Sequence, residues 1–193
     1  KRYLQLPQSG NPDTRAFIQQ LTREGYRGEA LIDYLMAHFN KQPYYYTLRP
    51  PRTGDAFFDD FLFETRRGFC AHFAGSFVYM LRLAGIPSRV VVGYQGGELN
   101  EQEGYLMVHQ YDAHAWVEVW REAVGWVKYD PAAMVAPDRI EKGLEEALKS
   151  PSNLKPKAVV MVGDCCEEEH GDIGRAALYL KRQGPACHYH QAL

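Results

Sequence analysis

The sequence lacks the features that mark several broad classes of protein. Its 193 residues contain no run of about 18 apolar positions, so we expect no membrane-spanning segment within this chain. A signal-peptide pattern is absent too, and because the chain begins at Lys1 rather than at methionine, we interpret it as an excised fragment. Positive charge is not in excess: the formal net charge is −2, which argues against nucleic acid as a partner.

Cysteine is scarce, and the four that occur match no common zinc-binding pattern. Cys165 and Cys166 are adjacent, which places them poorly around one tetrahedral ion, and Cys187 follows without a standard ligand spacing. We therefore predict no metal site and no other cofactor. The glycine-rich segment 95–104 likewise lacks the lysine and the following helix of a phosphate-binding loop.

The remaining composition is that of a globular domain, with 46% hydrophobic residues and enough length for a substantial core. Helical spacing of apolar residues predicts a helix that starts at Asn-Pro-Asp, positions 11–13, and further helices over two segments, 29–39 and 55–65. Strand patterns cover three segments, 44–48, 88–94 and 105–109.

Cys70 occupies the most informative position of the chain. Apolar residues recur at helical spacing after it until Gly-Ile-Pro at 85–87, so we predict an amphipathic helix that begins at this cysteine. A helix N-terminus carries partial positive charge and unpaired N–H groups, which favour thiolate over thiol. Cys70 is therefore a candidate nucleophile, although a small buried cysteine would suit the same position.

Residues 112–120 and 126–129 are predicted to form a β-hairpin. The first segment alternates in the manner of a strand, a turn follows, and Asp-Pro at 130–131 ends the return strand, because proline cannot continue a central ladder. Trp120 can pair with Val124 or, across a slightly longer loop, with Trp126.

Both of these registers bring His114 and Asp130 onto one face of the hairpin, whereas an odd register would put them on opposite faces. They are directly opposite in the first and diagonal neighbours in the second, with Cβ atoms about 4.5–8 Å apart. Asp130 would accept a hydrogen bond from one ring nitrogen of His114, and the other nitrogen would face the sulfur of Cys70. This predicts a nucleophile, a base and an orienting acid. His72 is a weaker candidate for the base, because it lies on a different helix face from Cys70.

Four segments, 66–70, 93–100, 112–116 and 130–131, together resemble the bacterial transglutaminase-like family, of the membrane-anchored TgpA type. The resemblance extends over residues 28–146. It implies an α+β fold with a papain-like, transglutaminase-type core, in which the cysteine-bearing helix packs on an antiparallel β-sheet. It also implies that Cys70, His114 and Asp130 are the catalytic triad. Ala71 departs from the pattern, since relatives often carry an acid there.

The sequence and the resemblance also indicate a domain organisation and a location. We predict a catalytic domain over residues 1–150, with a helical part over 1–40, and a C-terminal extension of uncertain structure over 151–193, where segments 157–162 and 174–183 could form a strand and a helix. The resemblance implies transmembrane helices on either side of this domain in the full-length protein. The domain itself would then be periplasmic, and the membrane would be contacted only through those flanking segments.

An acyl-transfer enzyme must stabilise an oxyanion, usually with two hydrogen-bond donors. The backbone N–H of Cys70 can supply one. The family places the second on the segment before the cysteine helix, and Tyr46 is the candidate there. Tyr44, on the same strand face, is its rival, and a tyrosine with an apolar body and a solvated hydroxyl is the simpler interpretation of either.

Two further residues are candidates for substrate binding. Trp116 shares a strand face with the predicted base and could form a groove wall, although a core tryptophan is the commoner role. Glu98, together with Glu101 and Glu103, could attract a cationic amine to the segment 95–104. A solvated, flexible loop is the simpler interpretation of this segment.

The predicted function is cysteine-dependent acyl transfer on glutamine or other amide groups of a protein or peptide, through a thioester intermediate. With an amine as acceptor the product is an isopeptide-type bond, and the resemblance favours this transglutaminase-like outcome. With water as acceptor the protein would be a cell-envelope cysteine peptidase or amidase. A non-catalytic binding scaffold is the third alternative.

Overall fold

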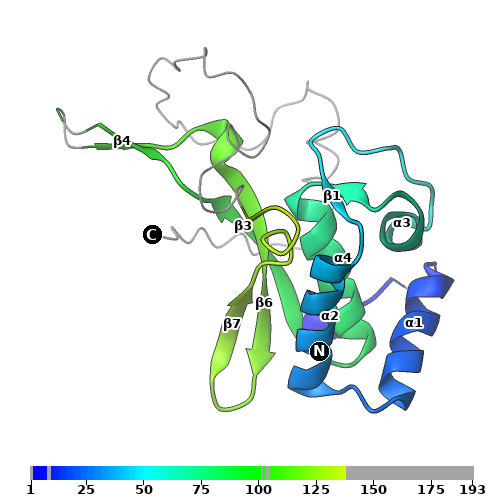
Figure 1. Ribbon diagram of the computed structural model, residues 1–193. Coiled ribbons are helices and arrows are strands. Elements are labelled where there is room, and N and C mark those ends of the chain that lie inside the picture. The colour runs from blue at the N-terminus through cyan, green and yellow to red at the C-terminus, as the bar shows by residue number, and fades with distance from the viewer. Residues whose placement is uncertain (1, 8–9, 101, 103–104, 138–193) are drawn as a thin grey trace.

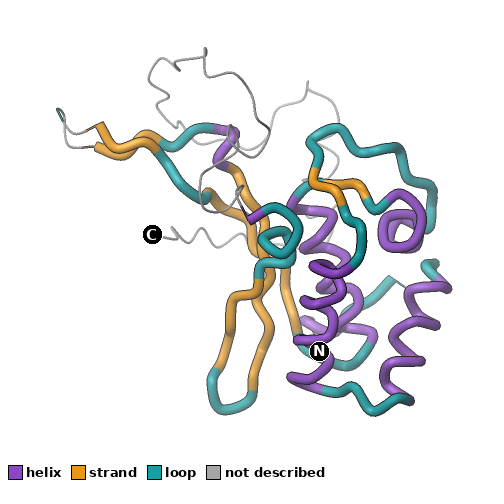
Figure 2. The backbone as a smooth tube through the Cα atoms, viewed as in Figure 1, coloured by secondary structure: helices purple, strands orange, loops and turns teal. Residues whose placement is uncertain are grey.

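The computed structural model describes residues 2–7, 10–100, 102 and 105–137 (Figure 1). Helices lie on one side of a three-stranded antiparallel sheet, which makes this an α+β fold (Figure 2). The strand and helix predicted for 157–162 and 174–183, and the predicted domain boundary after residue 150, lie outside the described residues.

The helical segments are η1 (Arg2–Leu4), α1 (Pro12–Arg23), α2 (Gly28–Lys41), α3 (Phe57–Asp59), the π-helical η2 (Asp60–Thr65), α4 (Cys70–Leu83) and η3 (Gln110–Asp112). The strands are β1 (Tyr45–Tyr46), β2 (Arg67–Gly68), β3 (Ser88–Tyr94), β4 (Glu98–Asn100), β5 (Tyr105–Met107), β6 (Ala113–Arg121) and β7 (Gly125–Tyr129).

The central sheet has the order β3-β6-β7, with both pairs antiparallel. Trp120 pairs with Trp126, so the longer of the two predicted hairpin loops is the one observed. Ala115, Val117 and Val119 alternate along β6 and belong to the buried core, which lies between this strand and α4. The strand predicted over 88–94 is confirmed as β3.

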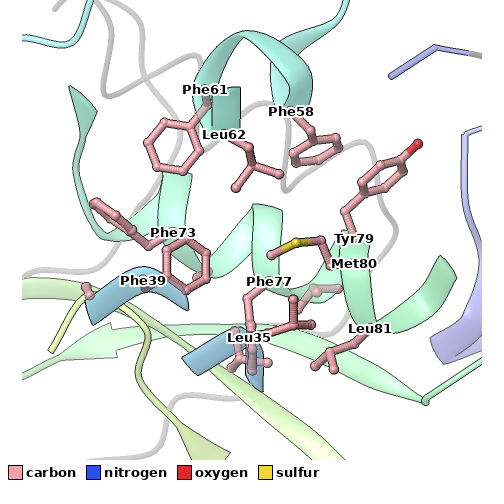
Figure 3. Packing of buried hydrophobic residues seen from close by; sticks show 14 of the residues in the cluster. Leu35, Phe39, Phe58, Phe61, Leu62, Phe73, Phe77, Tyr79, Met80 and Leu81 are labelled. Atoms are coloured by element: carbon pink, nitrogen blue, oxygen red, sulfur yellow. The ribbon is translucent and has the colours of Figure 1, made fainter. Parts of the chain in front are cut away.

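Helix α4 is the centre of the hydrophobic core (Figure 3). The ring of Phe73 lies 5.7 Å from that of Phe39 in α2 and 5.1 Å from that of Phe61 in η2, as measured between ring centroids. All three side chains are fully buried, as is Phe77 one turn further along α4. Burial of each such side chain contributes about 1.5–3 kcal/mol to folding, so this cluster fixes α4 firmly against its neighbours.

Helices α1 and α3 cap each other, a feature that the sequence patterns did not predict. The carboxylate of Asp59 accepts hydrogen bonds from the N–H groups of Asp13 (3.0 Å) and Thr14 (2.8 Å) and from the Thr14 hydroxyl (2.6 Å). In return, the side-chain oxygen of Asn11 accepts from the N–H groups of Phe58 (2.8 Å) and Asp59 (3.2 Å). Each helix start thus gains acceptors for N–H groups that have no partner within the helix.

Only a short part of the helix predicted over 55–65 is α-helical, namely α3. After α3 the chain widens into the π-helical η2, closed by a hydrogen bond from the N–H of Arg66 to the carbonyl of Phe61 (3.0 Å). Arg66 then adopts a left-handed conformation with φ 50°. Phe61 and Leu62 are adjacent in this wide turn, and both are buried in the core.

The segment 95–104 is not simply a flexible loop, which corrects the prediction. Strand β4 pairs antiparallel with β5, and this two-stranded ribbon projects away from the rest of the fold (Figure 1). Gly97 permits the pairing, because it has φ 146° and a Cβ there would lie 3.0 Å from the carbonyl oxygen of Met107. The strand predicted over 105–109 ends at Met107.

Candidate active site

Cys70 is the first residue of α4, and its placement depends on the short ribbon of β1 and β2. Gly68 pairs with Tyr46, two residues before the cysteine, and a Cβ at Gly68 would lie 2.6 Å from Cγ of His72. Only glycine therefore lets the chain approach α4 this closely. Cys70 is 9% exposed and is not part of a disulfide.

His114 and Asp130 lie together at one end of the central sheet. Nε2 of His114 is 2.7 Å from Oδ2 of Asp130, and His114 is 3% exposed. The other carboxylate oxygen of Asp130 accepts a hydrogen bond from the N–H of Ala132 (3.1 Å), so the carboxylate is held from both sides. The observed hairpin register makes the two residues diagonal neighbours.

The surroundings of His114 favour its protonated form. Burial lowers its pKa, but hydrogen bonds and charges from Asp130 and Cys70 outweigh burial and raise the pKa to about 9. Because Asp130 engages Nε2, the ring nitrogen left for Cys70 is Nδ1, which is buried and forms no hydrogen bond to a described nitrogen or oxygen. An imidazolium between a carboxylate and a cysteine is the electrostatic setting in which a thiolate is stable.

His72 is also buried, but its contacts differ. Its Nδ1 accepts a hydrogen bond from the N–H of Phe69 at the start of α4 (3.4 Å), and its ring packs against those of Phe57, Phe61 and Phe69. Burial lowers its pKa to about 4, so the ring is neutral at pH 7. His72 thus supports the helix start that presents Cys70, a role that its spacing in the sequence did not reveal.

The structure separates the two tyrosines that were candidates for the oxyanion site. The ring of Tyr46 is buried and stacks parallel to that of Phe73, with centroids 6.3 Å apart. The hydroxyl of Tyr44 donates to the carbonyl of Leu62 (3.1 Å) and lies 3.3 Å from Nε2 of His38. Burial raises the pKa of Tyr44, so its hydroxyl stays neutral, and it is hydrogen-bonded to the backbone of η2.

The two candidates for substrate binding, Trp116 and Glu98, lie in different parts of the fold. Trp116 is 3% exposed, its ring centroid lies 6.4 Å from that of His114, and Nζ of Lys128 lies 4.8 Å from the Trp116 ring. It therefore borders the histidine rather than forming an open wall. Glu98 begins the projecting ribbon, paired through its backbone with Met107. Glu101 and Glu103 lie outside the described residues.

The described ranges contain no group of three or more histidine, cysteine or acidic side chains arranged to hold a metal ion. Cys165, Cys166 and Cys187 lie outside these ranges. In the same described part, none of the helices combines the length and the apolar character that crossing a bilayer requires.

The family model of the transglutaminase-like superfamily matches residues 14–131, a range that includes Cys70, His114 and Asp130. The chain belongs to the transglutaminase-like superfamily. This membership confirms the α+β, transglutaminase-type core that the sequence motifs implied, with the cysteine at the start of a helix that packs on an antiparallel sheet.

The relatives include a protein-glutamine gamma-glutamyltransferase of Pseudomonas aeruginosa, 56% identical over 151 residues, which are 78% of this chain and 23% of that protein. The uncharacterized protein YebA of Bacillus subtilis is 36% identical over 139 residues, 67% of this chain and 19% of that protein. The crystal structure of the periplasmic domain of TgpA from Pseudomonas aeruginosa matches with a TM-score of 0.72 at 56% identity, covering 75% of this chain and 50% of that one. The chain thus spans about a fifth of the length of these curated relatives.

Proposed function

We propose that this protein is a cysteine-dependent acyltransferase that acts on the glutamine side chains of a protein or peptide. The proposal rests on the interactions of His114 with Asp130 and Cys70. The imidazole lies 2.7 Å from the Asp130 carboxylate, and both neighbours raise the pKa of His114. The 56% identity to a protein named protein-glutamine gamma-glutamyltransferase supports the choice of glutamine as the donor.

In the first half-reaction, the thiolate of Cys70 attacks the carboxamide carbon of glutamine. The oxyanion that forms would accept hydrogen bonds from the backbone N–H of Cys70, at the positive end of α4, and from the hydroxyl of Tyr46. Protonated His114 then donates its Nδ1 proton to the departing nitrogen, ammonia leaves, and a thioester remains on Cys70.

In the second half-reaction, the now neutral His114 removes a proton from a primary amine as the amine attacks the thioester. The thiolate leaves, the imidazolium is restored and an isopeptide-type bond is formed. Asp130 holds the imidazole in one orientation throughout and stabilises its charge. Trp116, packed beside the imidazole, would limit access of bulk water to that charge.

Water in place of the amine would give deamidation or, on a peptide bond, hydrolysis. The same residues perform both reactions, so the acceptor distinguishes a transferase from an amidase or peptidase. We further propose that residues 1–150 form the catalytic domain and that it is extracytoplasmic, part of a membrane-anchored protein. Its similarity to the periplasmic domain of TgpA supports this location.

Mass spectrometry with a glutamine-containing peptide and a small primary amine tests the proposal. The native protein should add the amine to the peptide with loss of ammonia, and Cys70→Ala should not. Conversion of glutamine to glutamate, with amine never incorporated, would favour the amidase. Equal product from the native protein and from Cys70→Ala would contradict cysteine-dependent transfer.

A further inference from the structure

The ribbon of β1 and β2 holds two exposed side chains at a fixed position beside the candidate nucleophile. The N–H of Tyr45 donates to the carbonyl of Arg66, and the N–H of Thr47 donates to the carbonyl of Gly68, each at 2.8 Å. Arg67 precedes Cys70 by three residues, so their Cα atoms are at most about 11 Å apart. Figure 1 shows β1 beside the end of α4 at which the cysteine lies.

Tyr45 and Arg67 are opposite partners in this ribbon, and their side chains meet on its outer face. The guanidinium carbon of Arg67 lies 5.3 Å from the centroid of the Tyr45 ring. Tyr45 is 60% exposed, whereas its neighbour Tyr46 points inward. A cation placed over an aromatic ring is attracted to its face, so this contact restrains the guanidinium near one position.

Arg67 differs from Arg89 and Arg121, whose guanidinium groups are paired with carboxylates. Arg89 is paired with Glu118 (Nε to Oε2, 2.7 Å), and Arg121 is paired with Glu29 (2.6 Å). Within the described residues, no carboxylate pairs with Arg67. Its N–H donors are therefore not engaged by a described carboxylate, and their planar arrangement matches the geometry of a carboxylate ligand.

We infer that Tyr45 and Arg67 form a subsite for a carboxylate on the glutamine donor, within about three residues of the reactive glutamine. The inference rests on the proposed function and specifies its substrate. An extended peptide advances about 3.3 Å per residue, so the upper limit of about 11 Å between the Cα atoms of Cys70 and Arg67 corresponds to at most about three residues. The carboxylate could belong to an acidic side chain or to the C-terminus of the donor, and the Tyr45 ring would cover the apolar part of the bound side chain.

Paired donor peptides test this subsite. They share one sequence and differ only in glutamate or glutamine at a single position, scanned over three residues on each side of the reactive glutamine. At low salt the native protein should prefer glutamate about fivefold in kcat/KM at one position, as expected for one favourable ion pair. The preference should shrink at high salt. A second pair of peptides ends at that same distance from the reactive glutamine, one with a free C-terminus and one with an amidated C-terminus. Comparing their kcat/KM values distinguishes a terminal carboxylate from an acidic side chain.

Arg67→Gln should bring this ratio to about one. The matched control is Arg23→Gln: Arg23 is also an exposed arginine, but it lies beside Leu83 and Ala84 at the opposite end of α4, about 20 Å from the cysteine. The control should keep the native ratio. A ratio near one for the native protein at every position, or a preference retained in Arg67→Gln, would overturn the inference.

Binding of the same peptides to Cys70→Ala, measured by fluorescence anisotropy with a neutral dye, reads the preference without any chemistry. A fivefold tighter binding of the glutamate peptide that is lost when Arg67→Gln is added supports the subsite even if the transfer reaction is not observed. Equal binding of both peptides contradicts the subsite and leaves the proposed acyl transfer untouched.

Discussion

His72 and His114 are both buried, yet the pKa values of their side chains are shifted in opposite directions. His72 lies among phenylalanine rings at the start of α4, and burial lowers its pKa to about 4. His114 lies at the end of the sheet, where Asp130 and Cys70 raise its pKa to about 9 despite burial. The exposed fraction of a histidine, 7% for one and 3% for the other, therefore does not decide its charge. The charge depends on the groups that contact the ring nitrogens.

The difference follows from what each ring nitrogen contacts. His72 accepts a hydrogen bond from the backbone N–H of Phe69, an interaction that needs a neutral nitrogen. His114 faces a carboxylate at 2.7 Å, an interaction that needs a proton on the ring. His72 is thus suited to hold the helix start in place, and His114 to carry the proton that the proposed mechanism requires.

The largest expected difference is between the same substitution made at His114 and at His72. His114→Gln removes the group that transfers the proton in the proposed mechanism, and we expect kcat/KM for amine incorporation to fall by about 10²–10⁴. His72→Gln retains a side-chain acceptor for Phe69 and should leave kcat/KM within about tenfold of the native value. Both values are to be normalised to the folded fraction, measured by circular dichroism. Similar losses in the two variants would remove the functional distinction between the histidines.

A similar comparison applies to the two tyrosines, with a smaller expected effect. Tyr46→Phe should lower kcat about 10²–10³-fold if its hydroxyl is the second oxyanion donor. Tyr44→Phe should leave kcat within threefold and instead lower the free energy of unfolding by about 1 kcal/mol, because it deletes the hydrogen bond to the carbonyl of Leu62. A change of less than threefold in kcat for Tyr46→Phe would exclude Tyr46 from the oxyanion site.

The last comparison concerns the pH dependence of stability. The folded-state pKa of His72 is below the ordinary value of 6.5, so the unfolded chain binds this proton more readily, and stability is lost as pH falls from 6.5 toward 4. The folded-state pKa of His114 is above 6.5, so its contribution is complete below pH 6.5 and is lost as pH rises through 9. Each pKa difference of about 2.5 from the ordinary value corresponds to a contribution on the order of 3–4 kcal/mol.

Urea unfolding followed by tryptophan fluorescence at several pH values measures both contributions. His72→Gln should flatten the loss of stability on the acid side, and His114→Gln should flatten it on the alkaline side. If both variants changed the same side, at least one of the two opposite pKa shifts would be wrong.

The sequence was sufficient for the parts of the site that depend on local patterns. The helix that begins at Cys70 and the strand over 88–94 follow from apolar spacing, and the period of two along a strand places His114 and Asp130 on one face in either register. It did not choose the register, because both loops fit the turn. That choice depends on the pairing of Trp120 with Trp126.

Features that depend on contacts between distant segments could not be predicted. The mutual capping of α1 and α3 joins Asn11 and Asp59, and no spacing rule links these two positions. The π-helical turn of η2, which buries Phe61 and Leu62 in the core, has no distinct signal in the spacing of apolar residues. The sequence likewise assigned His72 only as a weaker base, because its role depends on the aromatic rings that surround it in space.

The most direct test of the account is an NMR titration of the two histidine side chains in the native protein and in Asp130→Asn. We predict that His114 titrates near pH 9 and His72 near pH 4 in the native protein. In Asp130→Asn the pKa of His114 should fall markedly, because burial then opposes its charge with only Cys70 to support it, while that of His72 should not move. A His114 pKa at or below its ordinary value of 6.5 in the native protein, unchanged by Asp130→Asn, would contradict the linked set of Asp130, His114 and Cys70.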